Sequence, residues 1–137
     1  MTHTITLADT DGNPDTVQDA NWTSLGTVPP YADEPSGANC VYSGVMNSAK
    51  AFFGSDQAEF DIISPGVATV AGSGSTRSYT RFSDVILDVI EARIFLGIHF
   101  RSADVNGALL GQWVADYVDS HFFNCGPAGQ CKQEERE

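Results

Sequence analysis

The segment from Ser83 to Phe95 constrains the fold most, because its apolar residues recur every three or four positions, as on one face of an α-helix. Ser83 is placed to cap this helix, and Asp84 lies in the first turn, where an acidic side chain interacts favourably with the helix dipole. Asp84, Asp88 and Glu91 form the expected solvent stripe. The expected apolar face comprises Val85, Ile86, Val89, Ile90, Ile94 and Phe95. The pattern predicts a helical protein built around this segment.

Two further segments carry helical patterns. The first covers residues 37 to about 53, with Gly54 as a suitable stop, and the third covers about 104 to 121. Gly107 and Gly111, four residues apart, would let another helix approach the third helix closely. The apolar positions of the first helix are Val41, Val45, Ser48/Ala49 and Phe52, and the expected buried face of the third comprises Leu109, Leu110, Trp113, Val114, Tyr117 and Val118.

Two short strands are predicted between the first two helices. The sequences AEFDIIS (58–64) and TRSYTRF (76–82) are rich in β-branched and aromatic residues, and a segment rich in glycine joins them. The predicted fold class is therefore mainly α: a partial helical bundle of three main helices, with a short β-hairpin excursion between the first two.

The chain divides into three parts. Residues 1–35 are dense in turn-forming residues and are expected to be irregular, with Trp22 and Leu25 as anchors onto the body. Residues 36–123 form the helical domain, and residues 124–137 form a polar tail.

The composition limits the possible partners. A chain of 137 residues is one domain, and its formal net charge of -11 argues against nucleic acid and anionic membranes, which bind basic surfaces. No run approaches the roughly 18 apolar residues of a membrane span, and the first residues show no signal peptide, so we expect a soluble protein of unknown localisation.

The three cysteines leave the redox compartment open. Cys125 and Cys131 flank a short loop and could form a small disulfide, or could remain two free thiols. Cys40 is expected to be a buried, small apolar residue.

The start of the first helix is suited to binding an anion. Ser36 and Gly37 precede or open it, and a helix start offers unpaired N–H groups and partial positive charge. Arg93 lies on the apolar side of the second helix, where a buried guanidinium needs an anionic partner, and His99 follows six residues later, near the end of that helix. Alternatively, Arg93 pairs with a carboxylate at the edge of the core and His99 with a backbone carbonyl.

The sequences of these segments resemble those of one known superfamily. ARIFLGIHFRSAD (92–104), followed by GALLGQWVADYV, resembles the last active-site motif of vanadium-dependent haloperoxidases and of the related type 2 phosphatidic acid phosphatases. EPSGANC aligns with the superfamily's Pro-Ser-Gly-His helix start, and TRSYTRFSDVILDVIEARIF is similar to the bacterial haloperoxidase-like branch. The resemblance covers roughly residues 20–121 and corresponds to the C-terminal half of a family member.

The resemblance implies a set of site residues. His99 would bind vanadate axially, as the metal ligand, or act as the phosphate nucleophile of a phosphatase. Arg93, the Ser36 hydroxyl and the Gly37 N–H would hold the equatorial oxygens, because a buried oxyanion needs donors aimed at its oxygens. Vanadate is thus the implied cofactor, with phosphate as the alternative occupant.

The chain also departs from the family pattern. Ala38 occupies the position of the acid–base histidine, and the family's earlier Lys and Arg motif has no counterpart, since Lys50 is the only lysine before residue 132. The position of an orienting aspartate, four after His99, is Ala103, with Asp104 one residue further. These departures favour a degenerate, catalytically impaired site.

Three functions follow from these residues. The first is a truncated haloperoxidase-like domain that retains weak vanadate or phosphate binding. The second is an active haloperoxidase or acid phosphatase completed by another chain, and the third is a structural or interaction module without a ligand. Three helices alone would leave apolar side chains partly uncovered, which predicts a homo-oligomer or a complementary chain. These side chains are Val85, Val89, Leu109, Trp113 and Tyr117.

Overall fold

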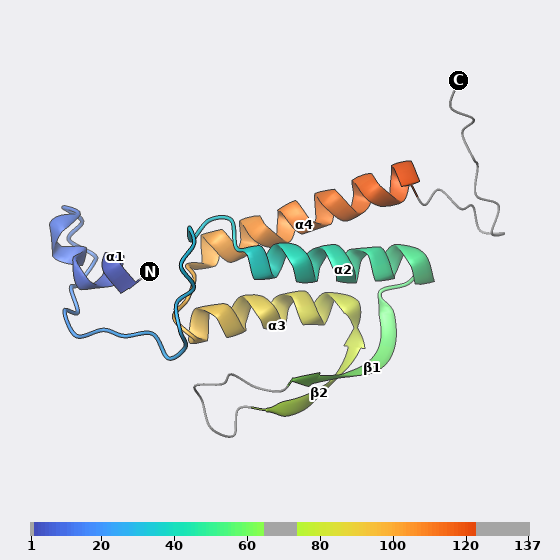
Figure 1. The fold of residues 1–137 in the computed structure, drawn as a ribbon, viewed down its shortest axis with the longest axis horizontal. Coiled ribbons are helices and arrows are strands. Elements are labelled where there is room, and N and C mark those ends of the chain that lie inside the picture. The colour runs from blue at the N-terminus through green and yellow to red at the C-terminus, as the bar shows by residue number, and fades with distance from the viewer. Residues whose placement is uncertain (1, 65–73, 123–137) are drawn as a thin grey trace.

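The computed structural model describes residues 2–64 and 74–122 and has the predicted fold class (Figure 1). Most of the hairpin connection, and the tail with Cys125 and Cys131, lie outside the described residues. The elements, in chain order, are α1 (Thr2–Thr6), a short 3-10 turn (Ala8–Thr10), α2 (Gly37–Phe53), β1 (Gln57–Ser64), β2 (Ser75–Arg81), α3 (Phe82–Phe95) and α4 (Arg101–Phe122). The structure thus confirms three main helices with an antiparallel hairpin between the first two.

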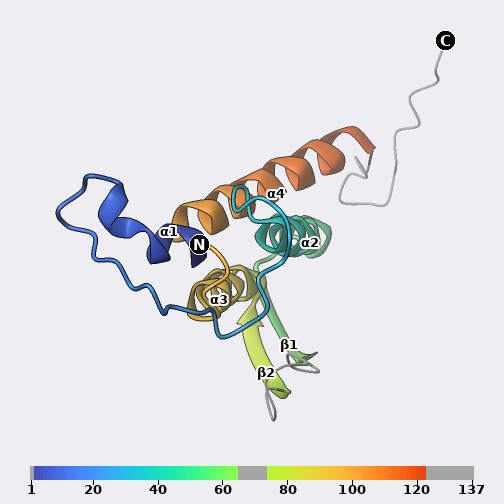
Figure 2. The ribbon, with the colours of Figure 1, turned by 60° about the vertical axis from the view of Figure 1, so that its left-hand side comes forward.

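Helix α2 lies between α3 and α4 and packs along both of them (Figures 1 and 2). Helices α2 and α4 run in the same direction, because Gly107 lies against Ser36 and Gly111 lies against Cys40 and Gly44. A side chain on either α4 glycine would collide with the α2 backbone. The predicted role of Gly107 and Gly111 in close helix approach is therefore confirmed.

This close approach overturns the predicted buried faces of α2 and α4. The residues that α4 buries are small or polar: Ala103, Asp104, Gly107, Gly111 and Ala115. The large residues expected there are exposed, with Trp113 64% accessible, and only Val118 is half-buried. On α2, Val41, Val45 and Phe52 are likewise exposed, whereas Asn39 and Ser43 are buried. Backbones this close leave no room for large side chains, so the apolar residues point outward.

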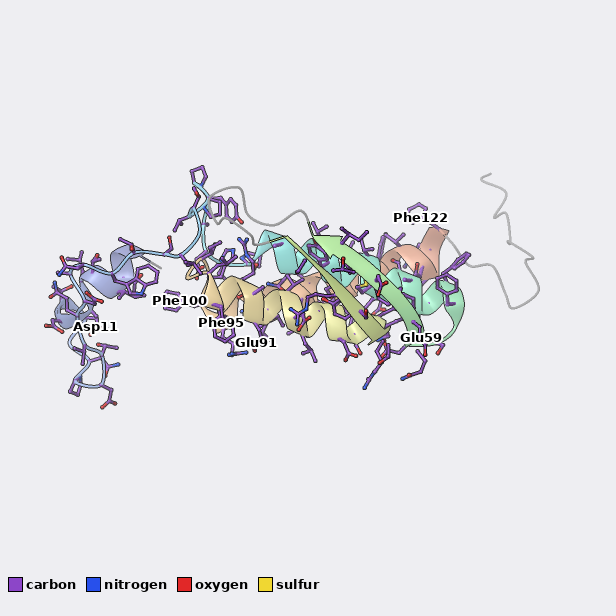
Figure 3. All side chains as sticks on the ribbon, turned by 90° about the horizontal axis from the view of Figure 1, so that it is seen from below. Asp11, Glu59, Glu91, Phe95, Phe100 and Phe122 are labelled. Atoms are coloured by element: carbon purple, nitrogen blue, oxygen red, sulfur yellow. The ribbon has the colours of Figure 1, made fainter. Side chains whose placement is uncertain are left out.

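Helix α3 carries the largest apolar contribution to the core. Val85 and Ile90 are buried as predicted, and Ile86, Val89 and Ile94 are half-buried. Phe95 was predicted to be buried but is 80% exposed, because it lies at the end of α3, beyond the body of α2 (Figure 3). The expectation that Val85 stays uncovered is also wrong, since Val85 is only 1% exposed.

The start of α3 is capped by Asp56 rather than by Ser83. The helix begins at Phe82, whose N–H donates to the Asp56 carbonyl at 3.0 Å, so Ser83 is already helical. The Asp56 carboxylate accepts the Ser83 N–H at 3.0 Å and its hydroxyl at 2.7 Å. The hydroxyl of Ser83 thereby lowers the pKa of Asp56. The predicted solvent stripe is only partly exposed: Glu91 is exposed, but Asp84 and Asp88 are half-buried.

The first part of the N-terminal segment lies away from α2, α3 and α4, with Asp11 beside α1 (Figure 3). Trp22 is confirmed as an anchor, because its ring packs against Gly97 and would lie 2.8 Å from a Cβ there. Leu25 is 67% exposed, so its prediction as an anchor was wrong. The Gly26 N–H, which donates to the Leu96 carbonyl at 3.3 Å, makes the second attachment instead. Among the described residues, no helix is long and apolar enough to cross a membrane.

Candidate oxyanion site

The candidate residues gather at one end of the bundle, where α2 and α4 begin, α3 ends, and the N-terminal segment crosses (Figures 1 and 2). The sequence placed His99 near the end of the second helix, but the structure places it beyond α3. The helix stops at Phe95, and Gly97 turns the chain with a φ of 69°, a conformation that favours glycine. His99 therefore belongs to the short connection between α3 and α4, which delivers its ring into the bundle end.

His99 is held in a defined orientation. The side chain is buried, and its Nδ1 lies 2.7 Å from Oδ1 of Asp33. A carboxylate only accepts hydrogen bonds, so Nδ1 carries a proton and a neutral ring keeps its lone pair on Nε2. The Nε2 atom is buried and has no hydrogen-bond partner among the described residues. His99 is therefore a presented ligand, and its partner is a carboxylate rather than the backbone carbonyl considered above.

Arg93 lies on the same side of the site. One of its terminal nitrogens, Nη2, donates to the Tyr31 hydroxyl at 3.0 Å, and the Tyr31 ring stacks on His99 with centroids 5.9 Å apart. The Nε atom of Arg93 is buried without a partner in the described chain, and no carboxylate there pairs with the guanidinium. The alternative in which Arg93 pairs with a carboxylate at the core edge is therefore wrong.

The start of α2 is tied to α4 through a buried polar cluster. Ser36, Asn39 and Asp104 are fully buried, and the Ser36 N–H donates to the Ala103 carbonyl at 2.9 Å. The Asn39 side-chain amide donates to Asp104 Oδ1 at 2.6 Å and to the Ser36 hydroxyl at 3.2 Å. The Ser36 hydroxyl also lies beside Asp104 and lowers the pKa of that carboxyl. It therefore faces α4, and it does not cap α2.

Burial raises the pKa of Asp104, while the neighbouring Ser36 and Asn39 side chains, together with His99 and Arg93, act in the opposite direction. Asp104 therefore lies within electrostatic reach of His99 and Arg93. Gly37 opens α2 and is exposed, and the N–H groups of this first turn have no partner within the helix. The predicted residues Ser36, Gly37, Arg93 and His99 thus share one end of the bundle.

Four buried polar atoms lack partners in the described chain, and all belong to this bundle end. They are Nε2 of His99, Nε of Arg93, Oδ1 of Asn39 and Oδ2 of Asp104. The first two suit an oxyanion, since one is a lone-pair ligand and the other a cationic donor. The two acceptors match a protonated oxygen, such as that of a hydrogen phosphate. A fully ionised anion would be repelled by Asp104 once this carboxyl is ionised.

The site has an adjoining pocket of about 50 Å³, lined by Val28, Pro29, Tyr31, Asp33, Ile98 and His99. Sequence reasoning missed Asp33 and Tyr31, because both lie in the segment expected to be irregular. It also missed Asn39 as part of the buried cluster. Among the described residues, no three His, Cys, Asp or Glu side chains are arranged to hold a metal cation.

The helical arrangement matches a known class of domain. A family model described as the VCPO second helical-bundle domain matches residues 4–125. The chain therefore belongs to this haloperoxidase-like domain family, which confirms the resemblance seen in the sequence.

Solved structures show the same fold. The holo-type bacterial vanadium-dependent chloroperoxidase superposes with a TM-score of 0.61 at 20% identity, covering 74% of this chain and 23% of that one. The apo-type enzyme gives 0.62 at 20% identity, with coverages of 77% and 24%. A bacterial vanadium-dependent iodoperoxidase gives 0.61 at 22% identity, with 74% and 24%. The chain thus spans about a quarter of the length of these structures. No curated protein matches it significantly.

Proposed function

We propose that this domain binds a small tetrahedral oxyanion, vanadate or phosphate, at His99, and that its catalytic groups are incomplete. The observation that carries the proposal is the buried Nε2 of His99, which has no partner among the described residues and whose lone pair is fixed by the bond from Nδ1 to Asp33. A carboxylate on the second ring nitrogen is the arrangement that orients histidine ligands in metal sites and increases their basicity. Burying a bare imidazole nitrogen is otherwise unfavourable.

The neighbouring groups have distinct roles. Arg93 supplies a fixed positive charge and a buried Nε–H donor, and the open first turn of α2 at Gly37 supplies backbone donors. Ser36 contributes less directly, because its hydroxyl accepts from the Asn39 side-chain amide at 3.2 Å and faces Asp104. When bound, vanadate would supply a Lewis-acid centre for peroxide activation, whereas phosphate at the same place would serve phosphoryl transfer.

Two features support impaired catalysis. Ala38 stands at the position that corresponds to an acid–base histidine, and a methyl group moves no proton. The described part of the chain also has no lysine at this end of the bundle, since Lys50 lies in the last turn of α2. Each lost charged donor to a buried oxyanion costs about 1.5–3 kcal/mol, so two losses would weaken binding by roughly two to four decades. We therefore expect weak binding, in the millimolar rather than the micromolar range.

The binding proposal is tested by titrating orthovanadate while following the imidazole resonances of His99 by NMR. We expect a saturable shift at His99 that is absent in His99→Ala. His121→Ala is the matched control, because His121 lies at the opposite end of α4 and is exposed. If the His99 resonances stay fixed up to tens of millimolar orthovanadate, the domain has no such site, and an interaction module without ligand becomes the better description.

Bromide oxidation and phosphate-ester hydrolysis, assayed in parallel, test the impairment. The wild-type chain should show little turnover, and Ala38→His should raise it if the missing acid–base group limits the reaction. Substantial wild-type turnover that His99→Ala abolishes would instead favour the second candidate, an active enzyme whose missing cations come from another chain. The exposed apolar side of α4, where Trp113 is 64% accessible, favours that candidate.

A further inference from the structure

We propose that the Tyr31 hydroxyl is a further oxyanion donor, which stands in for one of the cationic groups that this chain lacks. The inference rests on the function proposed above and assigns a specific role to a residue that the helical motifs do not contain. Tyr31 belongs to the irregular segment that crosses the end of the bundle (Figures 1 and 2).

The position of Tyr31 is fixed by three contacts. Its N–H donates to the Pro29 carbonyl at 2.9 Å, its ring stacks on His99 at an interplanar angle of 29°, and its hydroxyl lies 3.0 Å from Arg93 Nη2. Two residues further on, Asp33 binds His99, so the segment is attached to the site on both sides of the ring. Tyr31 therefore touches both the ligand and the cation of the proposed site.

The hydrogen-bond inventory of the phenol leaves one proton available. A guanidinium can only donate, so the Tyr31 oxygen accepts from Arg93 and its own O–H must point elsewhere. Among the described residues, no acceptor receives that proton. An oxyanion held between His99 Nε2 and Arg93 Nε would lie close to it and supply the missing acceptor.

Tyr31 is a neutral donor at the edge of the site. The half-exposed ring of Tyr31 covers His99 without requiring a counter-ion, and Arg93 polarises the phenol so that its O–H becomes a stronger donor. A hydrogen bond to a charged acceptor is about twice as strong as a neutral one. Tyr31 thus recovers part of the affinity lost with the missing lysine and arginine.

The test is Tyr31→Phe, which keeps the stacked ring and removes only the hydroxyl. Orthovanadate and inorganic phosphate are titrated against each variant while the imidazole resonances of His99 are followed by NMR. We expect Tyr31→Phe to bind about 10- to 100-fold more weakly than the wild type, as for the loss of one hydrogen bond to a charged group. Tyr42→Phe, an exposed tyrosine of α2, should bind like the wild type.

A second measurement on the wild-type chain does not depend on folding of the variant. The ¹³Cζ resonance of Tyr31 should shift during the orthovanadate titration, whereas that of Tyr42 should not. Wild-type binding with unchanged affinity in Tyr31→Phe and a static Tyr31 resonance would overturn this inference while leaving the His99 site intact. Absence of wild-type binding would overturn the proposed function as well, so the two failures are distinguishable.

Discussion

Gly44 and Gly111 face each other where α2 and α4 cross, and replacing each by alanine should have opposite effects on stability. A Cβ on Gly111 would lie 2.1 Å from the carbonyl oxygen of Cys40 and 2.9 Å from the backbone nitrogen of Gly44. Both are backbone atoms, so no side-chain rotation can relieve the collision and the helices must separate. A Cβ on Gly44 would meet only the Gly111 carbonyl oxygen, at an ordinary contact distance of 3.6 Å.

The magnitudes follow from two terms. Alanine is favoured over glycine in a helix interior by about 1 kcal/mol, and Gly44→Ala should gain roughly this amount. Gly111→Ala gains the same term but must move a rigid backbone by roughly 1 Å, and overpacking of this kind costs about 1–3 kcal/mol or more. We expect the upper end, because the obstacle is main chain, which leaves a net destabilisation of about 2 kcal/mol. The two variants should therefore differ by about 3 kcal/mol.

Urea unfolding followed by circular dichroism at 222 nm measures the difference. The unfolding midpoint of Gly44→Ala should rise and that of Gly111→Ala should fall, each relative to the wild type, with similar slopes. If Gly111→Ala were as stable as Gly44→Ala, the two helix backbones could not be in the close contact described, and the reassigned buried face of α4 would be wrong as well.

Three further predictions concern single side chains. Burial raises the pKa of Asp104, so the folded state holds this proton to higher pH than the unfolded state. Its contribution to stability is therefore present below the ordinary value of 3.8 and is lost as pH rises through the folded pKa. The stability of Asp104→Asn relative to the wild type, measured by urea unfolding, should accordingly increase between pH 4 and 8. A stability difference that stays constant over this range would contradict the prediction. Asp33→Asn keeps an oxygen acceptor for His99 but removes the charge. It should weaken orthovanadate binding about 10-fold and leave the helical circular dichroism spectrum unchanged. Undiminished affinity would show that the charge of Asp33 does not affect the binding strength of His99. The wild-type chain should self-associate through the exposed side of α4 in light scattering, and Trp113→Glu should shift it towards monomer, whereas a monomeric wild type would refute this.

Helix positions were predictable from the sequence because local patterns determine them. The bounds of α2 match the expectation, since Gly54 has the positive φ that ends a helix well, and the small residues Gly107 and Gly111 indicated close packing. The orientation of α4 was not predictable from hydrophobicity, because the large apolar residues suggest one buried face and the small residues another. The face with the small residues is buried because the α2 and α4 backbones are in close contact, and such a contact is a property of the tertiary structure.

The candidate site was predictable only in part, for a similar reason. Ser36, Gly37, Arg93 and His99 lie within motifs whose spacing is visible in the sequence, and they do meet at one end of the bundle. Asp33 and Tyr31 carry no local signal, because an aspartate and a tyrosine among prolines and turn formers are unremarkable until the chain brings them to His99. A long-range contact of this kind, across more than sixty positions, has no periodicity to reveal it.

The last motif of the sequence therefore combines two physical tasks. Arg93 and His99 each present a buried nitrogen that no described residue partners. Gly107 lets the start of α2 approach so closely that a Cβ on this glycine would lie 2.3 Å from the Ser36 carbonyl oxygen. The bond from the Ser36 N–H to the Ala103 carbonyl holds this approach in register. The glycines of α4 thus position the first turn of α2 at the bundle end that also holds His99, although they carry no chemistry.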